Sequence, residues 1–175
     1  MILRCTKKLL DVIKPHQLAA SPPDGEDWYA NLLWLGGRKC LLLTHAATLF
    51  SVFEADVRAA VLRDTGRLAT DLITRELLRE GLPPTTFGAL DPAAVAVAKT
   101  ADRSVLGCMN DMAFHCKVAI HDSGGLASTD IGGLNQALRR RIHSARGYAY
   151  PIELVLQQRG VTVSGTAADP REATT

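Results

Sequence analysis

The stretch from Asp102 to Ile120 carries polar side chains whose types and spacing could do chemistry. Asp111 and His115 are four residues apart, so on a helix their side chains lie on one face and can meet. An aspartate beside a histidine orients the imidazole and raises its pKa, as a general base requires. The pair therefore predicts the acid–base centre of a hydrolase or a nuclease. The alternative is the ordinary solvent face of an amphipathic helix.

Arg103, Ser104 and Asn110 form a second polar group on the same stretch. An arginine near a helix N-terminus opposes the helix dipole, which indicates a contact that outweighs this cost. Backbone N–H groups around Ser104 would suit a phosphate or a sulfate. We therefore expect a site for a small anionic ligand near Arg103 and Asn110, or a contact with a macromolecular partner there. An ordinary surface salt bridge is the alternative.

A basic cluster follows later in the chain, with Arg139, Arg140, His143 and Arg146 among its members. Such a cluster could contact the phosphates of a nucleic acid. Consecutive arginines on a helix point in different directions, however, so they cannot form one stripe. A net charge of +2 also gives no general attraction to nucleic acids or membranes. A solvated helix end is the alternative, because cations are favourable at a helix C-terminus.

The cysteines give no sign of a metal centre or a disulfide framework. Cys5, Cys40, Cys108 and Cys116 are scattered and form no Cys-x-x-Cys pair, whereas structural zinc sites use clustered ligands. The sequence also contains no phosphate-binding Walker loop, no dinucleotide fingerprint and no Gly-x-Ser-x-Gly motif. We therefore expect no metal and no cofactor, and we expect reduced thiols in a cytoplasmic protein.

Composition indicates one soluble domain. The chain has 175 residues, of which 47% are hydrophobic and 22% are charged, and both shares are ordinary for a globular protein. No apolar stretch reaches the ~18 residues that a membrane span needs, and no signal peptide is recognised. We expect one domain over residues 1–159 and a disordered tail over residues 160–175, which are rich in Thr, Ala and Gly.

Helices and strands of an α+β fold must position these side chains. The stretch from Asp102 to Ile120 is the clearest helix, because apolar residues recur in it at helical spacing and Asp102 can cap it. Strands are predicted over residues 2–5, 28–35, 39–44, 48–53 and 93–99, and further helices over 7–14, 56–80, 131–143 and 152–158. These elements predict an antiparallel sheet of about four or five strands with helices packed mainly on one face.

Several segments together resemble a family of small bacterial proteins that is catalogued only as a domain of unknown function. The clearest is the motif Arg-Ser-Val-Leu-Gly-Cys-Met-Asn-Asp at residues 103–111, and similar pieces lie at 4–10, 27–33, 38–40 and 48–53. The resemblance implies one domain and a bacterial origin, and it implies no particular activity. It also implies where a shared site would lie, since the motif residues are Lys7, Trp28, Asn31, Thr100, Arg103, Ser104, Asn110 and Asp111.

The leading hypothesis is therefore a binding or regulatory module of a bacterial cytoplasm. Its predicted ligand site comprises Lys7, Trp28, Asn31, Arg103, Ser104 and Asn110. One alternative is a hydrolase or nuclease that uses Asp111 and His115. The other is a nucleic-acid-binding protein that uses Arg139, Arg140 and Arg146.

Overall fold

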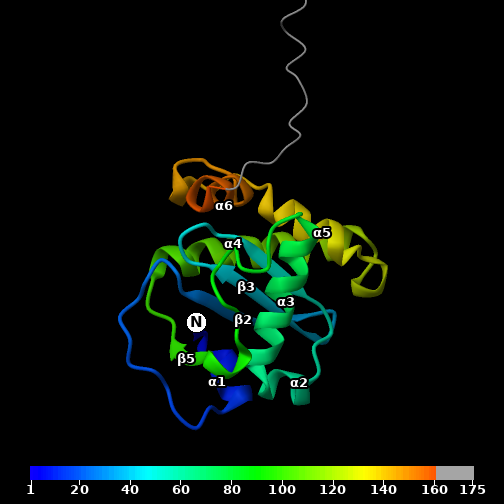
Figure 1. The fold of residues 1–175 in the computed structure, drawn as a ribbon. Coiled ribbons are helices and arrows are strands. Elements are labelled where there is room, and N and C mark those ends of the chain that lie inside the picture. Colours follow the sequence, from blue (N-terminus) through cyan, green and yellow to red (C-terminus); the bar gives the residue numbers. More distant parts are fainter. Residues whose placement is uncertain (161–175) are drawn as a thin grey trace, which may run out of the picture.

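A five-stranded sheet forms the centre of the molecule (Figure 1). The structure is a computed structural model, and it describes residues 1–160. The strands are β1 (Ile2–Cys5), β2 (Trp28–Leu35), β3 (Arg38–His45), β4 (Ser51–Glu54) and β5 (Ala96–Lys99), in the order β4-β3-β2-β1-β5. The α-helices are α1 (Lys7–Ile13), α2 (Ala59–Arg63), α3 (Thr65–Arg79), α4 (Arg103–Asp122), α5 (Ile131–Arg139) and α6 (Pro151–Arg159). The predicted α+β class is confirmed.

The sheet is mixed, and the prediction of a purely antiparallel sheet was wrong. β2, β3 and β4 are antiparallel neighbours, whereas β1 runs parallel to both β2 and β5. Parallel neighbours need a crossover connection rather than a tight turn. α1 lies in the connection from β1 to β2, and the longer connection from β4 to β5 contains α2 and α3. The direction of pairing depends on these distant connections, so the local pattern of β1 could not reveal it.

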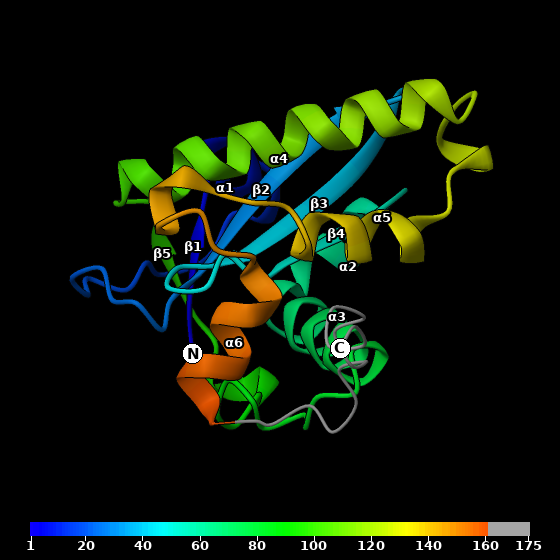
Figure 2. The same cartoon turned by 90° about the horizontal axis from the view of Figure 1, so that it is seen from above.

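Helices cover both faces of the sheet, which differs from the expectation of one covered face (Figure 2). Leu41 and Leu43 of β3 pack in one core with side chains of α1, α2, α3 and α6. Cys40 and Leu42 of the same strand point the other way and pack with α4 and α5. Successive strand residues face opposite sides, so an uninterrupted apolar run is typical of a strand buried on both faces.

α4 is the helix predicted from the sequence, while several of its neighbours differ from prediction in length. The carboxylate of Asp102 accepts hydrogen bonds at its N-terminus, as expected of a cap. The helix predicted over 56–80 is divided into α2 and α3. The helix predicted over 131–143 ends at Arg139, and an isolated bridge then pairs His143 with Ala149. Of the predicted disordered tail, residues 161–175 lie outside the described residues.

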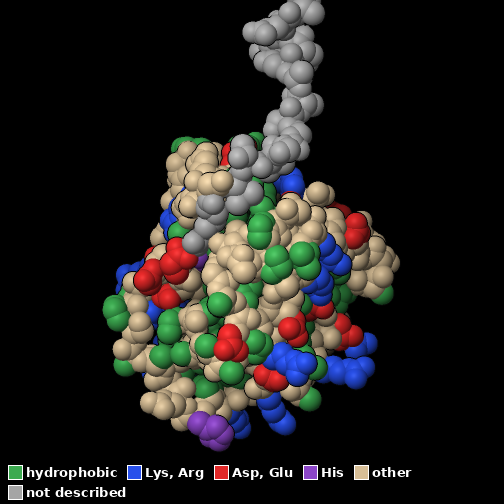
Figure 3. Space-filling model, in the orientation of Figure 1, with side chains coloured by type: hydrophobic (Ala, Val, Ile, Leu, Met, Phe, Trp, Pro, Cys, Tyr) green, Lys and Arg blue, Asp and Glu red, His purple; other side chains and the backbone are tan. Residues whose placement is uncertain are grey.

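The surface mixes charges of both signs. On the face seen in Figure 3, acidic and basic side chains are interspersed rather than gathered into a field of one sign. Within residues 1–160, no helix combines the length and the apolar character that crossing a membrane requires. The four cysteines are buried free thiols. The same residues contain no group of three or more His, Cys, Asp or Glu side chains arranged to hold a metal ion.

Candidate functional site

A cleft of about 340 Å³ lies between the first turns of α4 and the segment that follows α5. We call it the α4 cleft. On the α4 side it is lined at positions 103, 104, 107, 108 and 111, which recur every three or four residues and so share one helix face. The lining residues are Arg103, Ser104, Gly107, Cys108, Asp111, Ile142, His143, Ser144 and Ala145. Three of the residues singled out in the sequence, Arg103, Ser104 and Asp111, therefore lie together.

Gly107 leaves space in the cleft. A glycine inside a helix costs about 1 kcal/mol relative to alanine, so its presence in α4 is locally unfavourable. A Cβ atom added at Gly107 would meet no heavy atom within 4 Å. Helix packing therefore does not require glycine at this position, and a larger side chain would extend into the open volume of the cleft.

His143 is the side chain that sequence analysis did not assign to this site. It is only 7% exposed, and its Nε2 atom has no hydrogen-bond partner among the described residues. Burial and the nearby Arg141 guanidinium lower the pKa of His143, while the Asp111 carboxylate opposes this shift. The imidazole is therefore neutral at neutral pH and keeps hydrogen-bonding capacity. No local signal in the sequence could have paired His143 with α4, because the two meet only in the fold.

The N-terminus of α4 does not offer the anion site that was expected at its backbone. The Asp102 carboxylate already accepts hydrogen bonds from the N–H groups of Ser104, at 2.7 Å, and Val105, at 3.2 Å. A protein carboxylate thus occupies the position that a phosphate would take. The guanidinium of Arg103, in contrast, is exposed and forms no ion pair with any residue from 1 to 160. Arg103 is therefore the group at this end of the cleft that is free to bind an anion.

Asp111 and His115 do not form the expected pair. No hydrogen bond or ion pair joins them in the described part of the chain, and His115 lies one turn beyond the cleft. Burial and then Arg141 lower the pKa of His115, although Asp111 opposes this effect. This direction is opposite to the one expected, because desolvation of the imidazole outweighs a carboxylate that does not touch it. The hypothesis that Asp111 and His115 act as an acid–base pair stays a prediction. Of these two residues, only Asp111 lines the α4 cleft.

The other predicted ligand residues lie away from the α4 cleft. Trp28 is 1% exposed and packs in the core against Phe50 and Phe87. Asn110 lies on the exposed surface of α4. Asn31 accepts a hydrogen bond of 3.1 Å from Thr6 Oγ1, so its amide oxygen has a partner within the protein. Lys7 lines a different hollow, which is described below.

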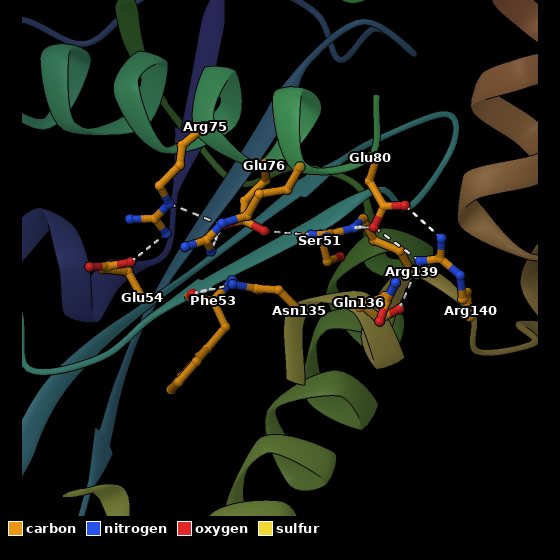
Figure 4. A network of polar contacts seen from close by, with 11 residues as sticks. Ser51, Phe53, Glu54, Arg75, Glu76, Glu80, Asn135, Gln136, Arg139 and Arg140 are labelled. Carbon is orange, nitrogen blue, oxygen red and sulfur yellow. Dashed lines mark hydrogen bonds and ion pairs between the residues drawn. The ribbon is translucent and has the colours of Figure 1, made fainter. Parts of the chain in front are cut away.

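Arg139 and Arg140 of the basic cluster form ion pairs with glutamates of the protein (Figure 4). Arg139 is 1% exposed and donates to Glu80 Oε1 at 2.7 Å and to Glu76 Oε2 at 3.1 Å. Arg140 donates to both carboxylate oxygens of Glu80. Arg146 donates to the backbone oxygens of residues 46 and 47. Phosphates of a nucleic acid could reach Arg139 only if the structure opened, and the nucleic-acid hypothesis stays a prediction.

Comparison with known proteins places the chain in a family without a known activity. The family model described as domain of unknown function DUF6933 matches residues 2–154. The match runs from β1 into α6 and includes every lining residue of the α4 cleft. No curated protein and no solved structure matches the chain.

Proposed function

The chain belongs to the DUF6933 family, and on that premise we propose that it is a module that binds a small organic anion in the α4 cleft. One observation carries the proposal. An arginine with no ion pair among residues 1–160 and a nine-tenths-buried histidine with an unpartnered nitrogen line the same cleft. Convergent polar groups of this kind are typical of small-molecule sites, and about 340 Å³ lies at the small end of their volumes.

The charges of the cleft set the orientation of the ligand. Arg103 presents a planar fork of donors that suits a carboxylate or a phosphate. Asp111 lies eight residues further along α4, which corresponds to about 12 Å along the helix axis. Its carboxylate repels an anion and accepts hydrogen bonds instead. The preferred ligand therefore carries its negative charge at the Arg103 end and a hydroxyl or amine donor at the end near Asp111 and His143.

We also propose that the protein works in a bacterial cytoplasm. The support is the family resemblance carried by residues 103–111 and the four buried thiols, none of which is paired in a disulfide. Free thiols are typical of reducing compartments. Detection of the protein in the membrane or periplasmic fraction of a bacterial host would contradict this assignment.

A thermal-shift titration tests the ligand site. The probes are sugar phosphates, nucleoside monophosphates and hydroxy acids, each of which joins an anion to hydroxyl donors. A ligand at 100 times its Kd stabilises a protein by about 2.7 kcal/mol, which raises the melting temperature of a domain of this size by about 5–10 °C. We expect at least one probe to give such a shift.

Two variants locate the effect in the α4 cleft. Arg103→Ala should abolish the shift without lowering the melting temperature of the free protein, because Arg103 makes no ion pair with residues 1–160. Gly107→Leu should abolish the shift by filling the cleft, while leucine favours the helix. Arg63→Ala, which removes an exposed arginine of α2, is the matched control and should leave the shift unchanged. No shift with any probe, or a shift that survives both cleft variants, would refute the proposal.

A further inference from the structure

In the parallel part of the sheet, the helices that follow two neighbouring strands pack on opposite faces of the sheet. The chain leaves β1 into α1, whose Leu9 packs on one face of the sheet, and leaves the neighbouring strand β5 into α4, which packs on the opposite face. Adjacent parallel strands whose helices depart to opposite faces leave a crevice outside their carboxyl ends. In open sheets of this type, ligands bind in that crevice.

A hollow of about 460 Å³ lies at this position, and we call it the strand-end cleft. Cys5 at the end of β1 and Lys99 at the end of β5 border it, and α1 supplies one wall. The loop between α1 and β2 supplies Leu18 on another side. The complete lining is Cys5, Lys7, Leu10, Asp11, Leu18, Lys99 and Thr100. Lys7 and Thr100 are motif residues that the α4 cleft does not include.

A buried arginine holds the walls of the strand-end cleft in place. Arg4 of β1 is 2% exposed and pairs with Asp27 at 2.5 Å. Its other nitrogens donate to the backbone oxygens of Ser21, at 2.9 Å, and Pro22, at 2.7 Å, in the loop, and to that of Lys99 at 3.3 Å. The loop is also bonded to the edge strand, since the N–H of residue 19 donates to the oxygen of residue 97 at 2.7 Å. The cleft is therefore preformed, which lowers the entropic cost of binding.

The lining combines an apolar interior with a cationic rim. Leu10, Leu18 and the Cys5 thiol are apolar, and burial raises the pKa of Cys5 to about 12, so this thiol stays neutral. Lys7 and Lys99 are exposed, and neither forms an ion pair within the described part of the chain. Asp11 is the one acidic residue among the lining residues, so the rim has an excess of positive charge.

We propose that the strand-end cleft is a second binding site, which takes an organic anion with an apolar body. A carboxylate or phosphate group would lie between Lys7 and Lys99, and an aromatic or short acyl body would lie against Leu10 and Leu18. This site does not depend on the α4 cleft, because no residue lines both. The two clefts are neighbours along the chain, because Lys99 and Thr100 line the strand-end cleft and Arg103 and Ser104, at the start of α4, line the α4 cleft.

A fluorescence titration with anilinonaphthalene sulfonate, an aromatic anion, tests this site on the full chain. We expect saturable binding that weakens about threefold to fivefold in Lys7→Ala and in Lys99→Ala, the effect of one partly exposed ion pair. Leu18→Asp, which adds a carboxylate to the wall, should weaken binding roughly tenfold or more. Lys8→Ala removes the exposed neighbour of Lys7 and is the matched control, with no expected change.

Competition separates the contribution of the charge from that of the apolar body. Octanoate and phenyl phosphate should displace the probe, whereas inorganic phosphate at the same concentration should not. Displacement by inorganic phosphate as effective as by phenyl phosphate would overturn the role of the apolar body. Binding that is unchanged in the Lys7→Ala, Lys99→Ala double variant would overturn the site itself. Binding lost in Arg103→Ala and kept in that double variant would place the probe in the α4 cleft and also overturn the proposal.

Discussion

Replacement of Arg139 by methionine should destabilise the protein by about 3 kcal/mol, because it breaks a buried network of charges. Arg139 joins α5 to α3 through Glu76, which is fully buried, and Glu80, and it also donates to the backbone oxygen of Ser51 at 3.3 Å. Removal of one partner of a buried ion pair costs about 3–5 kcal/mol. We expect the lower end of this range, because Glu76 keeps ion pairs with Arg75 and Arg79.

Urea unfolding followed by tryptophan fluorescence measures this change. The Arg139 guanidinium lies 5.1 Å from the centre of the Phe50 ring, which in turn packs against Trp28. Trp28 therefore reports on this part of the core. A loss of about 3 kcal/mol is a large share of the usual 5–15 kcal/mol of folding stability. It should also lower the melting temperature by about 6–12 °C.

A double variant separates the ion pair from simple loss of volume. Glu76→Leu together with Arg139→Met replaces the buried pair by apolar side chains, and such replacements are often far less damaging than removal of one charge. We expect the double variant to be at least ~2 kcal/mol more stable than the sum of the two single effects predicts. Arg140→Met is the control, because the Arg140 side chain is 45% exposed, and it should cost less than ~1 kcal/mol. Strict additivity, or an Arg139→Met cost below ~1 kcal/mol, would refute this reasoning.

Four further outcomes follow from the contacts described above. Burial alone would raise the pKa of Glu80, but hydrogen bonds from two arginines hold it below its ordinary value. The stabilisation that comes from ionised Glu80 is therefore complete above about pH 4.3 and is lost as the pH falls further. Arg140→Met removes one of these hydrogen bonds, so the variant should unfold at a higher pH than the wild type in an acid titration. An equal midpoint of the two unfolding curves would contradict this. Asp27→Asn leaves the buried Arg4 without the carboxylate that pairs with it and should cost about 3–5 kcal/mol of stability in urea unfolding. Faster proteolysis in the loop over residues 14–27 is a second measure. A cost within experimental error would argue against the role of Arg4 in holding this loop. Gly107→Ala should stabilise the protein by about 0.5–1 kcal/mol, because the added methyl group meets no neighbour, and a lower melting temperature would count against an open cleft. Burial raises the pKa of Cys116 to about 12, so iodoacetamide at pH 8 should alkylate it only after urea unfolding, and rapid alkylation of the native protein would show that α4 opens.

The sequence predicted those elements whose signal is local. The apolar residues of α4 recur at helical spacing and Asp102 stands at its start, so the bounds of that helix followed from residues close to one another. The pairing of β1 with β5 joins Ile2 to Ala96, and nothing in either four-residue strand encodes the partner or the direction. The uninterrupted apolar run Leu41–Leu43 is typical of a strand buried on both faces, and β3 is such a strand.

The same distinction applies to the candidate site. Arg103, Ser104 and Asp111 share a helix face because of their spacing, so their convergence could be predicted. His143 reaches the cleft from beyond α5, and no rule of spacing connects it to α4. Arginine is a residue type that usually lies at the surface, and nothing near Arg139 in the sequence indicates that it is buried. Its burial depends on Glu76, which is 63 residues away in the chain. Tertiary pairing decided which polar groups remain accessible to a ligand.

The position of β1 has a consequence during synthesis of the protein. β1 leaves the ribosome before β5, the strand that covers its outer edge and that follows roughly 90 residues later. At about 5–20 residues per second, that edge stays uncovered for about 5–20 s. An open strand edge is a template for association with other chains. A nascent chain that stalls before Ala96 is therefore expected to aggregate or to recruit chaperones, whereas release after Lys99 allows the sheet to close.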